Sequence, residues 1–78
     1  MLTCKITSPK GTNTYKDMQS VTIPAVSGNI QILPGHAELF ALLGKGKVSL
    51  QGKTSINKDV QIIKGECYMN NDVVTIII

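Results

Sequence analysis

Short runs of alternating apolar and polar residues, each closed by turn-forming residues, follow one another along this chain of 78 residues. The first run, Leu2 to Thr7, puts Cys4 and Ile6 on one side and stops at Ser8-Pro9-Lys10-Gly11, where proline and glycine favour a turn. A side-chain period of two is typical of strands that bury one face. The pattern therefore predicts an all-β chain built from antiparallel strands.

The remaining runs repeat this pattern at close spacing and predict a small antiparallel β-sandwich of two packed sheets with about ten short strands. The motif Asn70-Asn71-Asp72 is predicted as a hairpin tip, and GKGKV, from Gly44 to Val48, as a hairpin turn. The further predicted strands are Tyr15 to Ile23 with a stop at Pro24, Gly28 to Leu33, a run that contains Val48 and Leu50, Asp59 to Ile63, a stretch that contains Gly65 and Tyr68, and Val73 to Ile78.

One segment also fits a helix. In Leu39 to Leu43 the apolar residues have helix-like spacing, and Gly44 could act as a helix C-cap. On pattern alone a helix is slightly favoured, but a helix of two turns would be short and the rest of the chain is built for antiparallel pairing. We therefore predict a strand here. Its apolar residues are expected to supply core packing and one apolar patch for a partner.

Length and charge limit the classes of function. We expect a single domain over residues 1–78, because a chain this short has no room for a second hydrophobic core. The net charge of +3 comes from eight lysines with no arginine, and only Lys45 and Lys47 lie within two positions of each other. Nucleic-acid binding needs clustered cations and stacking aromatics, and the three aromatic residues are not grouped in the sequence. A small OB-like or SH3-like β-barrel that binds single-stranded nucleic acid is kept as the alternative hypothesis. Our main prediction is that the chain has no nucleic-acid partner.

Residues for catalysis or metal binding are scarce. Cys4 and Cys67 are too few for a structural zinc site and form no CxxC pair, so we expect reduced, buried thiols and no metal. Cys4 and His36 would be the only nucleophile and base, and no third group orients the base. GKGKV lacks the P-loop spacing. We predict no catalytic residues, no cofactor and no enzyme activity, and the apolar runs are far shorter than the ~20 residues of a membrane span.

A 19-residue stretch, GNIQILPGHAELFALLGKG from Gly28 to Gly46, carries a specific resemblance. It resembles the amino-terminal β-sandwich domain of the epsilon subunit of rotary F-type ATP synthases, most strongly at ILPGHA, from Ile32 to Ala37. The opening strand and the strand before Pro24 are also similar to that family. Independently of the family, Pro34 and Gly35 predict a sharp corner that ends one strand, because proline fixes φ and glycine accepts a positive φ.

The resemblance implies a non-catalytic rotor subunit of the central stalk that docks the gamma subunit to the c-ring and helps to couple ion flow to ATP synthesis. Carried over by position, Ser8, His36 and Ala41 would face gamma, while Ser27, Gly28 and Asn29 would face the loops of the c-ring. His36 can equally be explained as a capping or packing residue of the turn. The implied location is peripheral, at the cytoplasmic face of a bacterial inner (plasma) membrane, with membrane contact only through the complex.

The chain departs from the family pattern in several places. It has Asn29 where the family usually has an acidic residue, Gln31 where it has glycine, and Lys64-Gly65 in place of a Gly-Gly pair, which puts a long charged side chain where close backbone approach is usual. The family's C-terminal helical hairpin does not follow Ile78. A naturally short form and a single domain of a longer chain both fit, and a short form is expected to couple rotation without inhibiting ATP hydrolysis. Without gamma, the domain is expected to self-associate around Ala41.

Overall fold

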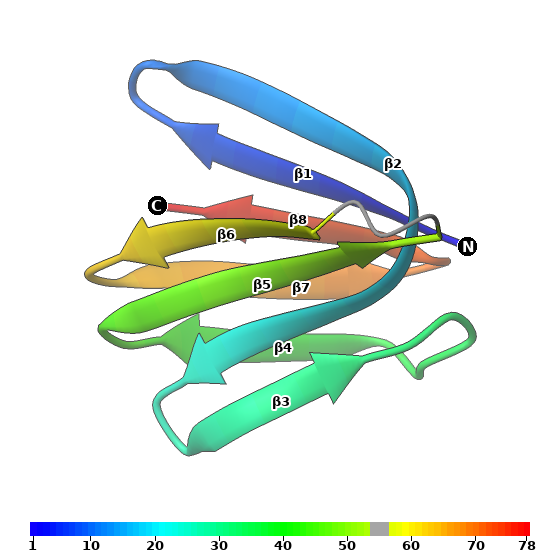
Figure 1. Ribbon diagram of the computed structural model, residues 1–78. Helices are drawn as coiled ribbons and strands as arrows, with labels where there is room; N and C mark the ends of the chain where they lie inside the picture. The colour runs from blue at the N-terminus through cyan, green and yellow to red at the C-terminus, as the bar shows by residue number, and fades with distance from the viewer. Residues whose placement is uncertain (54–56) are drawn as a thin grey trace.

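The alternating runs form eight β-strands in the computed structural model, which describes residues 1–53 and 57–78 (Figure 1). These residues form no helix, and so they contain no apolar helix long enough to span a membrane. The all-β prediction is confirmed. The strands are β1 (Leu2–Ser8), β2 (Gly11–Ala25), β3 (Gly28–Ile32), β4 (Leu39–Leu43), β5 (Gly46–Gly52), β6 (Asn57–Ile62), β7 (Gly65–Asn70) and β8 (Val73–Ile77).

The strands pair in the order β1-β8-β7-β4-β2-β5-β6, and β3 pairs with β2 beside this path. The ladder folds back on itself into two layers (Figure 1). One layer holds β5, β6, β3 and the second half of β2, and the other holds β4, β7 and β8, with the β1–β2 hairpin beside them. This arrangement is the predicted sandwich.

The described residues form eight strands where about ten short ones were expected. The main reason is β2, whose 15 residues begin at Gly11 and form one continuous strand. This strand pairs first with β1 and then with β5. It bends at a bulge between Met18 and Ser20, next to Asp17 with φ 59°. The predicted stop at Pro24 is wrong, because proline fits an extended backbone and its carbonyl accepts a hydrogen bond from the Gly44 N–H at 2.9 Å.

One strand pair is parallel, which the expectation of purely antiparallel pairing missed. β1 and β8 run side by side in the register from Thr3↔Val73 to Thr7↔Ile77. Two further hydrogen bonds extend this ladder, from the Thr3 N–H to the Asp72 carbonyl and from the Ile78 N–H to the Thr7 carbonyl. Parallel pairing needs a long connection between the strands. Here all the strands between β1 and β8 provide it.

The segment Leu39–Leu43 is a strand, as predicted against its helix-like spacing. Each of its residues pairs with β7, from Leu39↔Met69 to Leu43↔Gly65. Leu43 is buried, whereas Phe40 and Leu42 are each 55% exposed. The tertiary ladder therefore overrides the local pattern, and the segment supplies both core packing and an exposed apolar surface.

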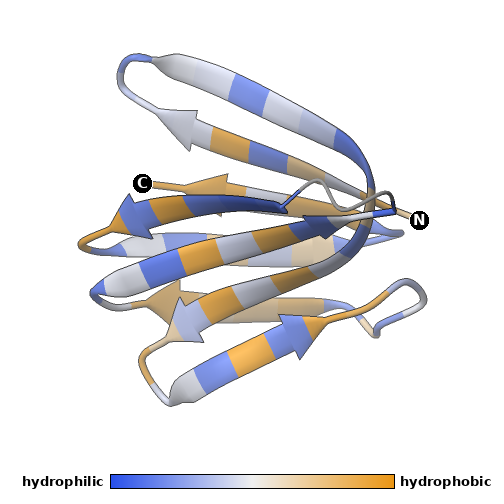
Figure 2. Cartoon of the chain, in the orientation of Figure 1, coloured by the Kyte–Doolittle hydropathy of each residue, from blue (hydrophilic) through white to orange (hydrophobic). Residues whose placement is uncertain are grey.

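The core lies between the two layers and consists of alternate residues of the strands (Figure 2). Both cysteines are free, as expected, and fully buried in this core. Burial raises the pKa of the Cys4 thiol to about 12, with a smaller contribution from Cys67, and raises the pKa of Cys67 to about 11. The buried apolar residues are Leu2, Cys4, Ile6, Met18, Val21, Ile23, Ala25, Ile32, Leu43, Val48, Leu50, Ile62, Cys67, Met69, Val74 and Ile76.

Pro9 and Lys10 form the predicted turn between β1 and β2. The hairpin turn predicted at GKGKV is wrong: Lys45 lies in the connection between β4 and β5, but β4 pairs with β2 and β7 whereas β5 pairs with β2 and β6. Asn71 and Asp72, at φ 50° and 61°, form the turn of the β7–β8 hairpin. Two successive positive φ values are typical of the type I′ turn that Asn and Asp favour. The hairpin tip predicted at this motif is therefore confirmed.

Candidate functional site

The sequence-predicted docking residues fall at two opposite ends of the sandwich (Figure 1). Four turns and the C-terminal residue lie at one end, which we call the turn end: 9–10, 26–27, 44–45 and 63–64. The β3–β4 loop, 33–38, and the β7–β8 turn lie at the other, the loop end. Ser8 is at the turn end, as are Ser27, Gly28 and Asn29, whereas His36 is at the loop end.

The Pro-Gly corner shapes the loop end. Gly35 has φ 81°, and the His36 N–H donates to the Leu33 carbonyl at 3.1 Å, which closes the turn. The His36 ring is exposed, and its Nδ1 donates to the Ala37 carbonyl at 2.8 Å. The Gly35 N–H donates to Asp72 Oδ1 at 2.8 Å and so ties the loop to the β7–β8 turn. His36 is thus a turn residue with an exposed ring.

Replacing Asp72 with alanine is expected to release the β3–β4 loop. The change removes the acceptor of the Gly35 N–H and puts alanine at φ 61°, so we expect a loss of about 1–2 kcal/mol in unfolding free energy. Asp72→Asn keeps an acceptor and tolerates the left-handed backbone, and serves as the control. Amide hydrogen exchange at Gly35 should become faster in the alanine variant alone. Equal exchange in both variants would show that the hydrogen bond does not hold the loop.

The three residues assigned to the ring side form the exposed β2–β3 turn and the start of β3. Gly28 has φ 127°, a backbone conformation that residues with a side chain rarely adopt. This explains why glycine stands at this position. Ser27 and Asn29 are exposed, and Asn29 pairs with Pro24 across the hairpin. The structure brings these three residues together at one protruding tip.

Ala41 lies closer to this tip than to the other two residues assigned to the gamma side. It is half-buried in β4 and lines a shallow hollow together with Val26, Ser27 and Ile30. His36 lies at the loop end and Ser8 lines a different groove. The structure therefore does not gather Ser8, His36 and Ala41 into one contiguous cluster, and an interface that uses all three would have to span the length of the sandwich.

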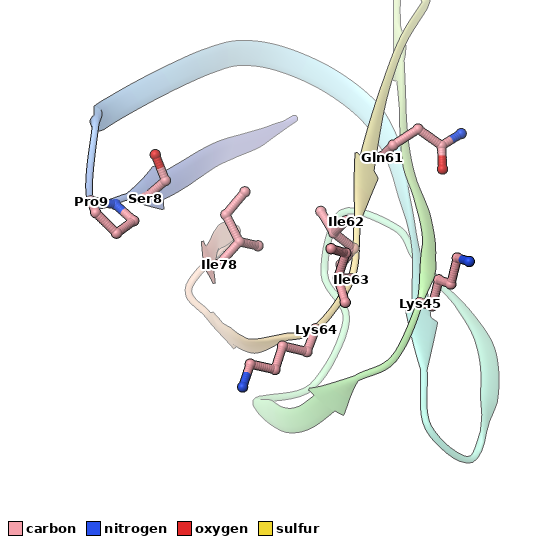
Figure 3. Close-up of a pocket in the computed structure, with 8 residues that line it drawn as sticks. All are labelled: Ser8, Pro9, Lys45, Gln61, Ile62, Ile63, Lys64 and Ile78. Carbon is pink, nitrogen blue, oxygen red and sulfur yellow. The ribbon is translucent and has the colours of Figure 1, made fainter.

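An apolar groove of about 660 Å³ opens between the layers at the turn end (Figure 3). Ile78 points across it toward Ile62 and Ile63, while the polar ends of Lys45 and Gln61 point away from it. Ile63 is 78% exposed. We call this the end groove, and the residues that line it are Ser8, Pro9, Lys45, Gln61, Ile62, Ile63, Lys64 and Ile78.

A second exposed apolar surface covers the outer side of β4, β7 and β8. Strand register puts Phe40 opposite Tyr68, Leu42 opposite Glu66, and Glu66 opposite Ile77. Val26 joins this surface, because its N–H donates to the Leu42 carbonyl at 2.8 Å. We call the set the outer patch, and it consists of Val26, Phe40, Leu42, Tyr68 and Ile77 around Glu66, with every apolar member at least 42% exposed.

Sequence reasoning found only part of the outer patch. It expected core packing and one apolar patch from the apolar residues of Leu39 to Leu43 but treated the aromatic residues as ungrouped. The structure corrects this, because the rings of Phe40 and Tyr68 pack at a centroid distance of 5.0 Å. Alternation in GECYMN, with Cys67 and Met69 buried, marks Glu66 and Tyr68 as outward-facing. Their pairing with β4 has no local signal in the sequence.

Glu66 gives the outer patch its charge. The Tyr68 hydroxyl donates to Glu66 Oε1 at 3.3 Å, and desolvation together with the nearby carboxylate raises the pKa of Tyr68. The salt bridge found among the described residues joins Lys47 and Asp59, at 3.5 Å between Nζ and Oδ2, and does not involve Glu66. The outer patch is thus apolar and aromatic with one carboxylate at its centre.

These surfaces suit docking. Within residues 1–53 and 57–78, no three His, Cys, Asp or Glu side chains gather closely enough to hold a metal ion. Cys4 is fully buried and has a raised pKa, whereas His36 is exposed at the loop end, so the two do not form a nucleophile and base pair. What the fold does present is a rigid sandwich with two exposed apolar surfaces and polar loops at both ends.

Comparison with known proteins identifies a family. The family model described as "ATP synthase, Delta/Epsilon chain, beta-sandwich domain" matches residues 1–78. The ATP synthase epsilon chain of Wolinella succinogenes is 37% identical over 59 residues, covering 72% of this chain and 45% of that protein. The ATP synthase epsilon chain of Lawsonia intracellularis is 37% identical over 73 residues, covering 94% and 54%. The chain spans about half the length of the curated relatives it matches.

Solved structures support the same fold. A chain in the cryo-EM structure of the Euglena gracilis mitochondrial ATP synthase, titled OSCP/F1/c-ring, matches with a TM-score of 0.88 over 97% of this chain and 49% of that one, at 19% identity. A chain in the central stalk/c-ring structure of the Tetrahymena thermophila enzyme matches with a TM-score of 0.80 over 97% and 61%, at 10% identity. At these identities the likeness concerns the fold.

Proposed function

The chain belongs to the family of ATP synthase delta/epsilon β-sandwich domains, and on that premise we propose that it is a non-catalytic rotor component of the central stalk. In this role it docks the gamma subunit to the c-ring and helps to couple ion flow to ATP synthesis. The observation that carries the proposal is the family match over all 78 residues, together with relatives that are 37% identical epsilon chains.

The physical properties of the fold support this role. A rotor component transmits torque only if its contact surfaces are held by a close-packed core. Here 15-residue β2 takes part in both layers, and the tip at Ser27, Gly28 and Asn29 projects from that framework. We propose that this tip faces the c-ring loops and that Ser8, His36 and Ala41 lie on the gamma side. The proposed place is peripheral, at the cytoplasmic face of a bacterial inner membrane.

The test is complex formation with the cognate gamma subunit. Mixed at micromolar concentration, the two proteins are expected to elute as a one-to-one complex with a Kd of about 1 μM or tighter. Asn29→Ala, on the proposed ring side, should leave this complex intact and serves as the control. Failure of the wild-type chain to form the complex would refute the proposal.

The nucleic-acid alternative finds no support on the outer patch, although two aromatic rings meet there. Glu66 lies beside those rings, and a carboxylate at that place repels phosphate. We therefore expect no binding of single-stranded DNA. Affinity for DNA that falls steeply with salt concentration would favour the alternative, and the gamma test above would then fail.

A further inference from the structure

We propose that the outer patch binds a basic side chain, an arginine or lysine flanked by apolar residues, on the protein segment that docks there. The inference rests on the proposed function, in which that segment belongs to the gamma subunit. It assigns to Glu66 the role of the anionic anchor at the centre of an apolar interface.

Strand register fixes the geometry of the patch. Glu66 lies in one row between Leu42 on β4 and Ile77 on β8, and the Phe40–Tyr68 pair forms the next row along β4 and β7. The ring planes of this pair are tilted by 50°, and both side chains are exposed. Because three paired strands hold these side chains, their spacing is set by the sheet.

The charge of Glu66 decides what can cover the patch. An apolar partner alone would strip water from the carboxylate and leave it with the Tyr68 hydroxyl as its bonding partner, at a substantial desolvation cost. A cation on the partner removes this cost by pairing with the carboxylate. Arginine fits best, because its planar fork can bond to the carboxylate while it stacks on an aromatic ring.

A second copy of this chain is a poorer occupant. A symmetric pair formed through the outer patch would bring the two Glu66 carboxylates toward the same dyad, where like charges repel. Lys64 lines a hollow at the edge of the patch together with Leu42, Glu66 and Ile77, but the salt bridge found among the described residues does not join it to Glu66. The charge pattern therefore favours a partner of different sequence, with complementary charge.

The experiment compares charge variants of the full chain in complex with the cognate gamma subunit. Glu66→Lys should weaken the complex by about 100-fold, and Glu66→Gln by about 10-fold, because the first replaces attraction with repulsion and the second only removes the charge. Asp59→Lys is the matched control, since it reverses the charge of an exposed carboxylate on β6, in the other layer, and its Kd should stay within about twofold. Circular dichroism checks that each variant folds, and the near-isosteric Gln variant carries the test if the Lys variant does not fold.

A rescue experiment identifies the cation. An arginine or lysine of gamma that lies at the interface, replaced by glutamate, should weaken binding to the wild-type chain and restore binding to Glu66→Lys. If gamma binds the wild-type chain but the Glu66 variants bind as tightly as Asp59→Lys, the inference is wrong and the proposed function stands. If gamma does not bind the wild-type chain at all, both are wrong.

Discussion

Replacing Gly65 with alanine is expected to lower the melting temperature of the domain by about 10–20 °C. A Cβ atom at Gly65 would lie 2.5 Å from the Ile77 carbonyl oxygen and 3.0 Å from Ile78 Cγ2. The isoleucine side chain can move, but the carbonyl belongs to β8 and can shift only if the β7–β8 ladder changes. Such overpacking costs about 2–3 kcal/mol, a large share of the stability of a chain this short.

Gly44→Ala is the matched control. Its added Cβ would meet only Val26 Cγ2, at 3.9 Å, which is an ordinary van der Waals contact. Alanine also restricts the unfolded chain, so the melting temperature should stay level or rise slightly. Thermal melts followed by circular dichroism compare the two variants. Equal melting temperatures would show that β8 adjusts to the methyl group without cost.

The same site clarifies one departure from the family pattern. The Lys64-Gly65 pair was expected to put a long side chain where close backbone approach is usual. In the structure, Lys64 lies exposed in the β6–β7 turn, and the close approach to β8 falls on Gly65. The lysine is therefore accommodated, because only the second position of the pair needs a glycine.

Local features of the sequence predict most of the fold. Alternation predicts which side of each strand is buried, as at Val48 and Leu50, because the side-chain period of a strand is two. Turn chemistry predicts the hairpin at Asn71 and Asp72, because few residues accept two successive positive φ values. The parallel pairing of β1 with β8 and the continuity of β2 through Pro24 could not be predicted this way. The first depends on contacts between segments far apart in the chain, whereas the second extends the strand by a single residue beyond the proline, to Ala25.

In the candidate site, too, some features could be predicted from the local sequence and others could not. The Pro34-Gly35 corner and the exposed Ser27–Asn29 tip follow from local backbone preferences. The outer patch does not, because Phe40 meets Tyr68 only through the β4–β7 register. The helix-like spacing of Leu39 to Leu43 even pointed away from it, since a helix would have turned Phe40 and Leu42 to other directions. A surface formed by three strands depends on how the strands pair in the tertiary structure.

Raising the pH from 9 to 11 is expected to reduce the free energy of unfolding by about 4 kcal/mol, because burial makes the two thiols resist ionisation in the folded state. Cys4 and Cys67 have an ordinary pKa of 9.0, raised by burial to about 12 and about 11. Below pH 9 the thiols are protonated in both states, so they add no pH dependence. Above it the unfolded chain loses both protons, while folded Cys4 keeps its proton and folded Cys67 begins to lose its own as the pH approaches 11, so the cost is at most about 1.4 kcal/mol per thiol and pH unit.

Urea unfolding at several pH values between 8 and 11 measures this slope. The double variant Cys4→Ala with Cys67→Ala is the control: cavities lower its stability at every pH, but its decline between pH 9 and 11 should be smaller by the contribution of the thiols. In the folded wild-type chain at pH 8, both thiols should also resist a disulfide reagent that labels them at once in urea, because buried thiols with raised pKa values form little thiolate. Parallel pH slopes in the two proteins, or rapid labelling of the folded chain, would contradict the buried, protonated state of this pair.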